Sequence, residues 1–188
     1  MEVCDQWDDC LDSKVIDNFA GSSCDVVGRS IPEIVNRSGG WFTFSSADIT
    51  PSFGVGDPGA EWADMACGAW TTGGIQSFKA TDYAGMGVSL NNGSAYSLEG
   101  YTGVSVQMES ANPVILFVQT SNHYEFMTTL SGGIGVLTYN IPFGTLVPFI
   151  NASTPSGAIL DLTQVTYIEF QATSLASFGF AVHLVSLY

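Results

Sequence analysis

The residues best suited to chemistry are aromatic side chains that lie near polar groups. An aromatic ring can stack on the apolar face of a sugar ring, while neighbouring polar groups hydrogen-bond its hydroxyls. Trp41 lies in the regular segment WFTFS, so we expect it to pack in the core. We expect Trp62 and Trp70 in loops, where they would be exposed. The candidates for ligand contact are Arg37, Trp62, Trp70, Tyr83, His123 and Tyr124.

Arg37 begins the stretch RSGGWFTF and has two alternative roles. Its planar guanidinium can hydrogen-bond the hydroxyls or a carboxylate of a ligand. It can equally hold its own loop by donating to backbone carbonyls. The sequence leaves both roles open.

Acidic side chains near the predicted loops are candidates for a calcium site, because calcium takes carboxylate and carbonyl oxygens. No EF-hand spacing joins them, and Asp25 is a further acid in this region. No other cofactor is expected. The candidate ligands are Asp17, Asp57, Glu61 and Asp64.

No catalytic signature is present in the sequence. The two histidines, His123 and His183, lie far apart, and no G-x-S-x-G nucleophile motif occurs. Glycoside hydrolysis would need two acids on either side of a cleft. Glu99, Glu109, Glu125 and Glu169 lie on or near predicted strands without a fixed pattern, so we expect a protein that is not an enzyme, with a hydrolase as the weaker alternative.

Composition limits the class of partner. The chain has 188 residues, of which 46% are hydrophobic, and a net charge of −14 from 18 acids and four bases. The bases are scattered, whereas nucleic-acid and anionic-membrane binding need clustered Lys and Arg. No apolar run reaches the length of a membrane span. We therefore expect neither nucleic acid nor a membrane span.

Four cysteines lie in the first part of the chain without a zinc-binding spacing. In a chain this rich in Ser, Thr and Gly, an even count fits two disulfides in an oxidising compartment. Cys4–Cys10 and Cys24–Cys67 is one of three connectivities, and buried thiols are the alternative. Residues 1–13 are acidic and carry no leader pattern, so we expect the mature form of a secreted or cell-surface protein.

The elements that position these residues are predicted to be strands. Alternation with a period of two recurs between Gly, Pro and Asn turn signals, and no stretch sustains a helical period. The predicted fold is an all-β antiparallel sandwich or jelly roll of about ten strands, with residues 1–13 as a lead and 14–188 as one domain. We expect residues 48–68 to be an irregular loop. The main strand segments are 14–21, 41–45, 74–82, 83–91, 100–110, 114–120, 123–130, 135–143, 165–173 and 178–188.

Four segments resemble those of carbohydrate-binding-module jelly rolls with galactose-binding-like topology, related to family 11 and to secreted myxobacterial-type proteins. VIDNF resembles their I-D-D-F strand, and NRSGGWFTFS resembles G-R-x-G-x-W-Y. YAGMGVSLN and SAYSLEGYTGVSVQM resemble two later segments in the same order. The resemblance implies a jelly roll that binds a glycan.

Two departures bear on the resemblance. The closing strand FAVHLVSLY lacks the family's acidic pair, which puts a structural calcium in doubt, and the family's cysteine pair and long loop are missing around residues 120–124. The leading prediction is a secreted, non-catalytic module that binds a polysaccharide or surface glycan by stacking and hydrogen bonds. The alternative is a structural or adhesive extracellular protein that self-associates into a homo-oligomer, surface layer or filament through strand edges.

Overall fold

A computed structural model describes residues 14–19, 30–31, 37–46, 52–55, 67–70, 83–151, 153–173 and 179–188, and for 52–55, 67–70 and 173 only the backbone. These residues form two antiparallel sheets, each of six strands. Their only helical elements are the 3₁₀ turns η1 (Phe143–Thr145) and η2 (Leu162–Gln164). Within this part of the chain, no helix has the length and apolar character needed to span a membrane.

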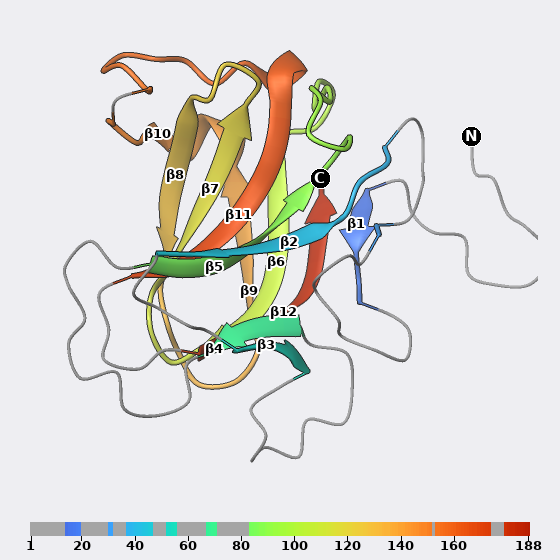
Figure 1. Cartoon of the computed structure of the whole chain (residues 1–188), viewed down its shortest axis with the longest axis vertical. Coiled ribbons are helices and arrows are strands. Elements are labelled where there is room, and N and C mark those ends of the chain that lie inside the picture. The colour runs from blue at the N-terminus through green and yellow to red at the C-terminus, as the bar shows by residue number, and fades with distance from the viewer. Residues whose placement is uncertain are drawn as a thin grey trace, which may run out of the picture.

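Sheet A has the strand order β3-β4-β12-β6-β9, with β1 added beside β12. Sheet B has the order β10-β8-β7-β11-β5-β2. In Figure 1, sheet B is strongly twisted: β7 and β8 stand upright while β5 and β2 run across the view. The strands are β1 (Val15–Asp17), β2 (Trp41–Ser45), β3 (Ser52–Val55), β4 (Cys67–Trp70), β5 (Tyr83–Ser89), β6 (Gly103–Ser110), β7 (Val114–Thr120), β8 (Glu125–Leu130), β9 (Leu137–Pro142), β10 (Val147–Pro148), β11 (Val165–Thr173) and β12 (Gly179–Leu187).

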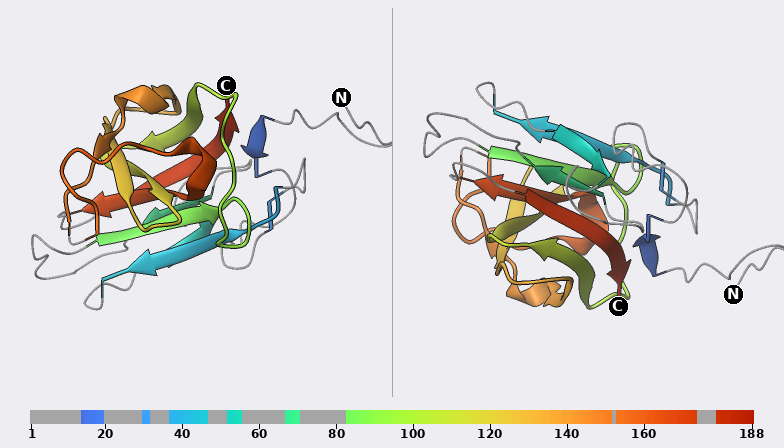
Figure 2. Two further views of the ribbon diagram at one scale, coloured as in Figure 1. Left: turned by 90° about the horizontal axis from the view of Figure 1, so that it is seen from above. Right: turned by 90° about the horizontal axis from the view of Figure 1, so that it is seen from below.

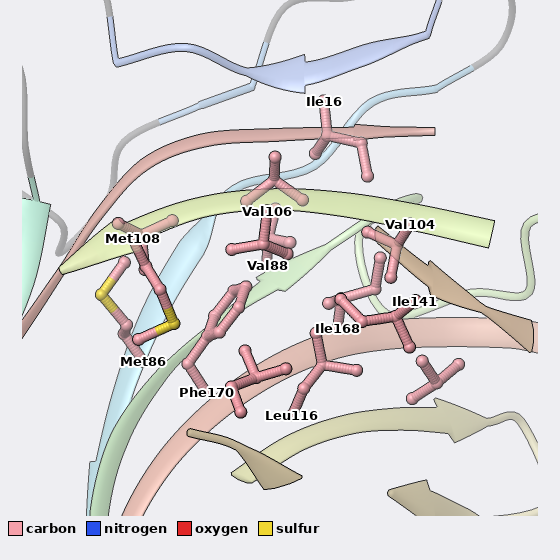
Figure 3. Close-up of a cluster of buried hydrophobic side chains, with 14 of the residues drawn as sticks. Ile16, Met86, Val88, Val104, Val106, Met108, Leu116, Ile141, Ile168 and Phe170 are labelled. Carbon is pink, nitrogen blue, oxygen red and sulfur yellow. The ribbon is translucent and has the colours of Figure 1, made fainter. Parts of the chain in front are cut away.

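The core lies between the two sheets. Figure 2 shows β2 and β5 on one side of the molecule and β6 and β12 on the other. Because successive side chains of a strand point to opposite faces, every second residue of the central strands enters this space. In Figure 3, Met86, Leu116 and Phe170 of sheet B point towards Val106 and Met108 of sheet A. The predicted sandwich is therefore confirmed.

The alternation in β2 places Trp41 on the core side, where it is 3% exposed, as predicted. Two other predictions were wrong in detail. The first strand ends at Asp17, because Phe19 has a φ of 53° and leaves the extended conformation. The predicted loop 48–68 contains β3, which pairs with β4 so that Gly54 lies opposite Gly68. This strand tolerates Pro51 because the proline precedes it, and its glycines weaken but do not forbid pairing.

Candidate functional site

The structure does not bring the predicted ligand residues together. Tyr83 is 38% exposed and begins β5, opposite Thr173 at the end of β11. His123 and Tyr124 follow β7, whose last residue lies opposite Val165 at the start of β11. Eight residue steps along β11 separate these positions, or about 26 Å. These three candidates therefore lie at opposite ends of sheet B.

The other candidates are divided between strand and turn positions. Trp70 is part of β4 in sheet A, where a loop position was expected, and Trp62 lies outside the described residues. His123 is a turn residue with a φ of 63° whose N–H donates to the Thr120 carbonyl at 2.8 Å. The Tyr124 ring packs against the core. The turn that carries His123 and Tyr124 is thus held by local contacts.

Arg37 and Asp17 form a buried clasp, each 1% exposed. Arg37 donates from its terminal nitrogen to the Val15 carbonyl, which corresponds to its predicted structural role. The Asp17 carboxylate accepts from the Trp41 indole N–H at 2.8 Å and from the Phe19 N–H at 2.7 Å. Burial lowers the pKa of Arg37, and the nearby Tyr96, Tyr101 and Asp17 oppose this effect. The clasp joins β1 of sheet A to β2 of sheet B, so in this conformation Arg37 is removed from the surface.

The calcium and disulfide predictions stay predictions. Among the described residues, no group of three or more His, Cys, Asp or Glu side chains could hold a metal ion. The other predicted ligands, Asp57, Glu61 and Asp64, lie outside the described residues, as do Cys4, Cys10 and Cys24. Cys67 lies on β4, where only the backbone is described.

The strongest grouping of functional side chains lies on the outer face of sheet B. Phe42 and Phe44 alternate with the core residues of β2 and therefore point away from the core. The Phe42 ring meets the edge of Tyr167 at a centroid distance of 5.3 Å, and lies 6.1 Å from Phe44. Phe44 in turn lies 6.2 Å from Tyr83. We call these four rings the aromatic strip: Phe42, Phe44, Tyr83 and Tyr167.

Two glycines of β5 make room for the aromatic strip. Gly87 pairs with Phe42, and Gly85 pairs with Phe44. A β-carbon at Gly87 would lie 2.6 Å from Phe42 Cζ, and one at Gly85 would also lie 2.6 Å from Phe44 Cζ. Contacts this short would force the rings to move, so the two phenylalanine rings occupy the space that side chains on β5 would fill. The rings therefore lie directly over the backbone of the neighbouring strand.

A second pair of rings lies further across the same sheet. Phe117 of β7 contacts Phe149 edge-on, with centroids 5.3 Å apart. Cross-strand pairing aligns Phe42, Gly87, Glu169, Phe117, Met127 and Val147 in one row over all six strands of sheet B. Five strand spacings make this row about 24 Å long. The row thus has an aromatic group towards each end and a carboxyl group between them.

Two carboxyl groups lie on this outer face in different environments. Glu125 accepts from Asn151 Nδ2 at 2.5 Å and from Gln119 Nε2 at 3.4 Å. Glu169 receives no hydrogen bond from the described residues. Burial, with a contribution from the Glu125 charge, raises the pKa of Glu169 from an ordinary 4.5 to about 7. We call the aromatic face the outer side of sheet B that holds the aromatic strip, Phe117, Phe149, Gln119, Gln171, Glu125 and Glu169.

Sequence reasoning identified Tyr83 of this face and missed Phe42, Phe44, Tyr167 and Glu169 as a group. The available signal was the alternation of aromatics in WFTFS together with GMG in the strand after Tyr83. Bulky residues on one strand and glycines at matching spacing on another indicate rings that lie over a neighbour. The same alternation that places Trp41 in the core places Phe42 and Phe44 on the outer face.

Comparison of the fold with solved structures finds carbohydrate-binding modules. A family 11 module of the cellulosomal cellulase Lic26A-Cel5E of Clostridium thermocellum has a TM-score of 0.63 and 18% identity, covering 93% of this chain and 92% of that one. A Clostridium thermocellum family 11 module in complex with a β-1,3-1,4-mixed-linked tetrasaccharide has a TM-score of 0.61 and 17% identity, with 93% and 94% coverage. A mutant family 29 module complexed with mannohexaose has a TM-score of 0.51 and 14% identity, with 93% and 89% coverage.

These likenesses confirm the jelly-roll fold expected from the sequence resemblance to family 11. No protein-family model matches the chain, and no curated protein sequence does. At 14–18% identity the likeness concerns the fold.

Proposed function

We propose that this protein is a secreted, non-catalytic module that binds a polysaccharide chain across the aromatic face. The observation that carries the proposal is the aromatic strip itself. Four contacting rings lie on the outer side of a sheet, where they add nothing to the core between the sheets. Tyr83 is exposed, and Phe42, Phe44 and Tyr167 are half-buried. Aromatic groups that solvent can reach, beside polar side chains, provide stacking for sugar rings and hydrogen bonds for their hydroxyls.

The direction and length of the bound chain follow from the row of outward residues. A glycan laid across the strands would pass the aromatic strip and then Glu169 and Gln171, whereas Phe117 further along is only 3% exposed and lies beneath this path. The row of about 24 Å suits an oligosaccharide of several units. The solved family 11 and family 29 complexes with a mixed-linked tetrasaccharide and with mannohexaose support a β-linked glucan or mannan as the ligand.

Isothermal titration with cellohexaose, a mixed-linked β-glucan and mannohexaose tests the proposal. We expect at least one of these ligands to bind, and the double variant Phe42→Ala/Phe44→Ala to lose binding by about tenfold or more. Gln107→Ala is the matched control, because Gln107 points outward from β6 on sheet A, and this variant should bind normally. Absence of binding to a broad set of glycans, or equal losses in both variants, would contradict the proposal.

Hydrolysis is the weaker alternative, and the positions of the acids argue against it. Glycosidases place their two carboxyl groups on either side of the scissile bond. Glu125 and Glu169 lie on one face of one sheet, so both would approach a bound glycan from the same side. We expect no release of reducing ends from any glycan that binds, and release that disappears in Glu169→Gln would reverse this conclusion.

Self-association is the second candidate function. Val147, Phe149 and Ile150 are 55%, 39% and 69% exposed, and they lie on or next to β10, the two-residue edge strand of sheet B. Exposed apolar groups beside a strand edge favour contact with another chain. Sedimentation of the wild type and of Ile150→Lys tests this idea. A monomer at every concentration would remove it.

A further inference from the structure

The charge of the aromatic face limits the kind of glycan that it can hold. Of the residues that the structure describes, only Lys14 and Arg37 carry a positive charge. Arg37 is buried in the clasp, and Lys14 precedes β1, which pairs with sheet A. The described part of the aromatic face therefore holds two carboxyl groups and no cation. Like charges placed against each other are unfavourable, so uronic acid and sulfated polymers fit this face poorly.

Glu169 occupies the centre of the face. It lies on β11 between Gly87 of β5 and Phe117 of β7. A β-carbon at Gly87 would lie 2.9 Å from Glu169 Cγ and 2.6 Å from Phe42 Cζ, so the glutamate stem and the phenylalanine ring meet over the same glycine. The carboxyl group thus stands beside the aromatic strip.

Glu125 and Glu169 differ in the hydrogen bonds that their carboxyl groups receive. Glu125 already has donors from Asn151 and Gln119, whereas Glu169 has none among the described residues. A partly buried carboxylate without a donor is unfavourable, and an opposite charge relieves this cost. The raised pKa of Glu169 agrees with this unrelieved state. A ligand that brings a positive charge would restore the ionised carboxylate.

Aromatic rings beside such a carboxylate favour one kind of cation. The face of a ring attracts an ammonium group within about 6 Å of its centroid, and aromatic sites bind ammonium ligands in this way. A carboxylate adds a charge-assisted hydrogen bond, which is stronger than a neutral one. Phe42 and Glu169 together supply both contacts over Gly87.

We propose that the aromatic face selects a polysaccharide that carries primary ammonium groups, such as a polymer of glucosamine, and that Glu169 is the residue that pairs with the ammonium. This inference rests on the proposed function and specifies its ligand class. The sugar rings stack on the aromatic strip, and an amino group on a ring near the middle of the face meets the carboxylate. Removing the positive charge by N-acetylation removes the pairing but keeps the rings.

The test compares hexaglucosamine, hexa-N-acetylglucosamine and cellohexaose by isothermal titration. It is done at physiological ionic strength and at a mildly acidic pH, at which most of the glucosamine amines are protonated. We expect the wild type to bind hexaglucosamine about tenfold more tightly than either neutral hexasaccharide. In Glu169→Gln, the ratio of the hexaglucosamine and cellohexaose affinities should fall to about one.

Glu109→Gln is the matched control for general attraction between an acidic protein and a cationic polymer. Glu109 lies on β6 in sheet A, and burial raises its pKa also. Its substitution removes the same single charge, so the ratio should stay at its wild-type value. Equal falls in the two variants would overturn the inference, because they would show attraction by net charge alone.

The wild-type ranking tests the inference even if a variant folds poorly. Tighter binding of cellohexaose than of hexaglucosamine would overturn the ammonium site while leaving the proposed glycan binding intact. Failure to bind any of the three, and any neutral glucan or mannan, would overturn the proposed function and this inference with it.

Discussion

The outer faces of the two sheets differ, although the same core lies behind both. On sheet A, the residues that point outward from β6 and β9 are mainly small or polar, including Ser105, Gln107 and Asn140. On sheet B, the corresponding positions hold the aromatic strip and Glu169. A polar outer face is sufficient for a sandwich to fold. The aromatic groups of sheet B are therefore not explained by folding, and this difference is the reason to assign ligand contact to sheet B.

The largest expected effect is a loss of stability on substitution of Gly85, which lies against the backbone of β11. A β-carbon at Gly85 would lie 2.2 Å from the Phe170 carbonyl oxygen, which belongs to the backbone of β11 and cannot move aside cheaply. We expect Gly85→Ala to lower the free energy of unfolding by about 3 kcal/mol, the upper range for overpacking. Gly144→Ala is the control, because nothing lies within 4 Å of its β-carbon position. Urea unfolding measures both, and equal stabilities would contradict this account of the face.

The next effect follows from Glu169, whose pKa is raised to about 7. The folded state then holds a proton that the unfolded state releases near 4.5, so stability falls as the pH rises from about 4.5 to about 7. The full shift corresponds to about 3 kcal/mol, and we expect Glu169→Gln to gain about 2 kcal/mol over the wild type at pH values above this window. Below the window the two proteins should be equally stable. Thermal melts across this range check the prediction, and a constant difference at every pH would contradict it.

A smaller effect distinguishes adjacent residues on opposite sides of β2. Trp41→Phe keeps an aromatic ring in the core but leaves the buried Asp17 carboxylate without the indole donor. Because the lost hydrogen bond has a charged acceptor, we expect a loss of about 2 kcal/mol in the free energy of unfolding. Phe42→Tyr, on the outward side, should change stability by less than half of this. Denaturant titration compares them, and the reverse order would mean that the assignment of inner and outer sides is wrong.

The smallest expected effect concerns a single contact of the aromatic strip. Tyr167→Ala removes the ring that forms the T-shaped pair with Phe42 and should weaken glycan binding by about 1 kcal/mol, or about fivefold. Thr138→Ala, on the outward side of β9 in sheet A, should leave affinity unchanged. Affinity electrophoresis through a gel containing the bound glycan measures both variants. A loss in Thr138→Ala as large as in Tyr167→Ala would place the ligand elsewhere.

The fold could be predicted from the sequence because alternation is a local property. The period of two in segments such as WFTFS and GVSVQMES marks strands and one of their buried sides. The positions of β3 and of Trp70 could not be predicted, because glycines and Pro51 hide a short edge strand that depends on its partners. Strand pairing across long sequence separations has no local signal.

The candidate site was predicted less well than the fold, for the same physical reason. Trp41 and Phe42 are adjacent large aromatic residues in one strand, so alternation shows that they face opposite sides but does not by itself assign the outward side a ligand. Only the pairing of β2 with β5 and of β5 with β11, which depends on register, places Phe42 beside Tyr167 and Glu169. The choice of loop tryptophans over strand phenylalanines followed from the expectation that strand aromatics are buried. Arg37 shows the same limit, because a cation beside an aromatic strand fits either a ligand contact or a structural role, and the structure buries it in the clasp.

Gly87 allows the shape of the aromatic face to be changed without replacing any of its binding side chains. The atoms that a β-carbon there would meet belong to two side chains, the ring end of Phe42 at Cζ and the stem of Glu169 at Cγ, and not to the backbone. Side chains can shift where backbone cannot, so an alanine at this position would move the ring and the carboxyl group while every binding residue keeps its identity. The residue at position 87 thus affects the shape of the aromatic face, whereas Phe42 and Glu169 supply its chemical groups. Substitutions of increasing size at residue 87 could therefore shift the Phe42 ring and the Glu169 carboxyl group by increasing amounts, without replacing any group proposed to touch the ligand.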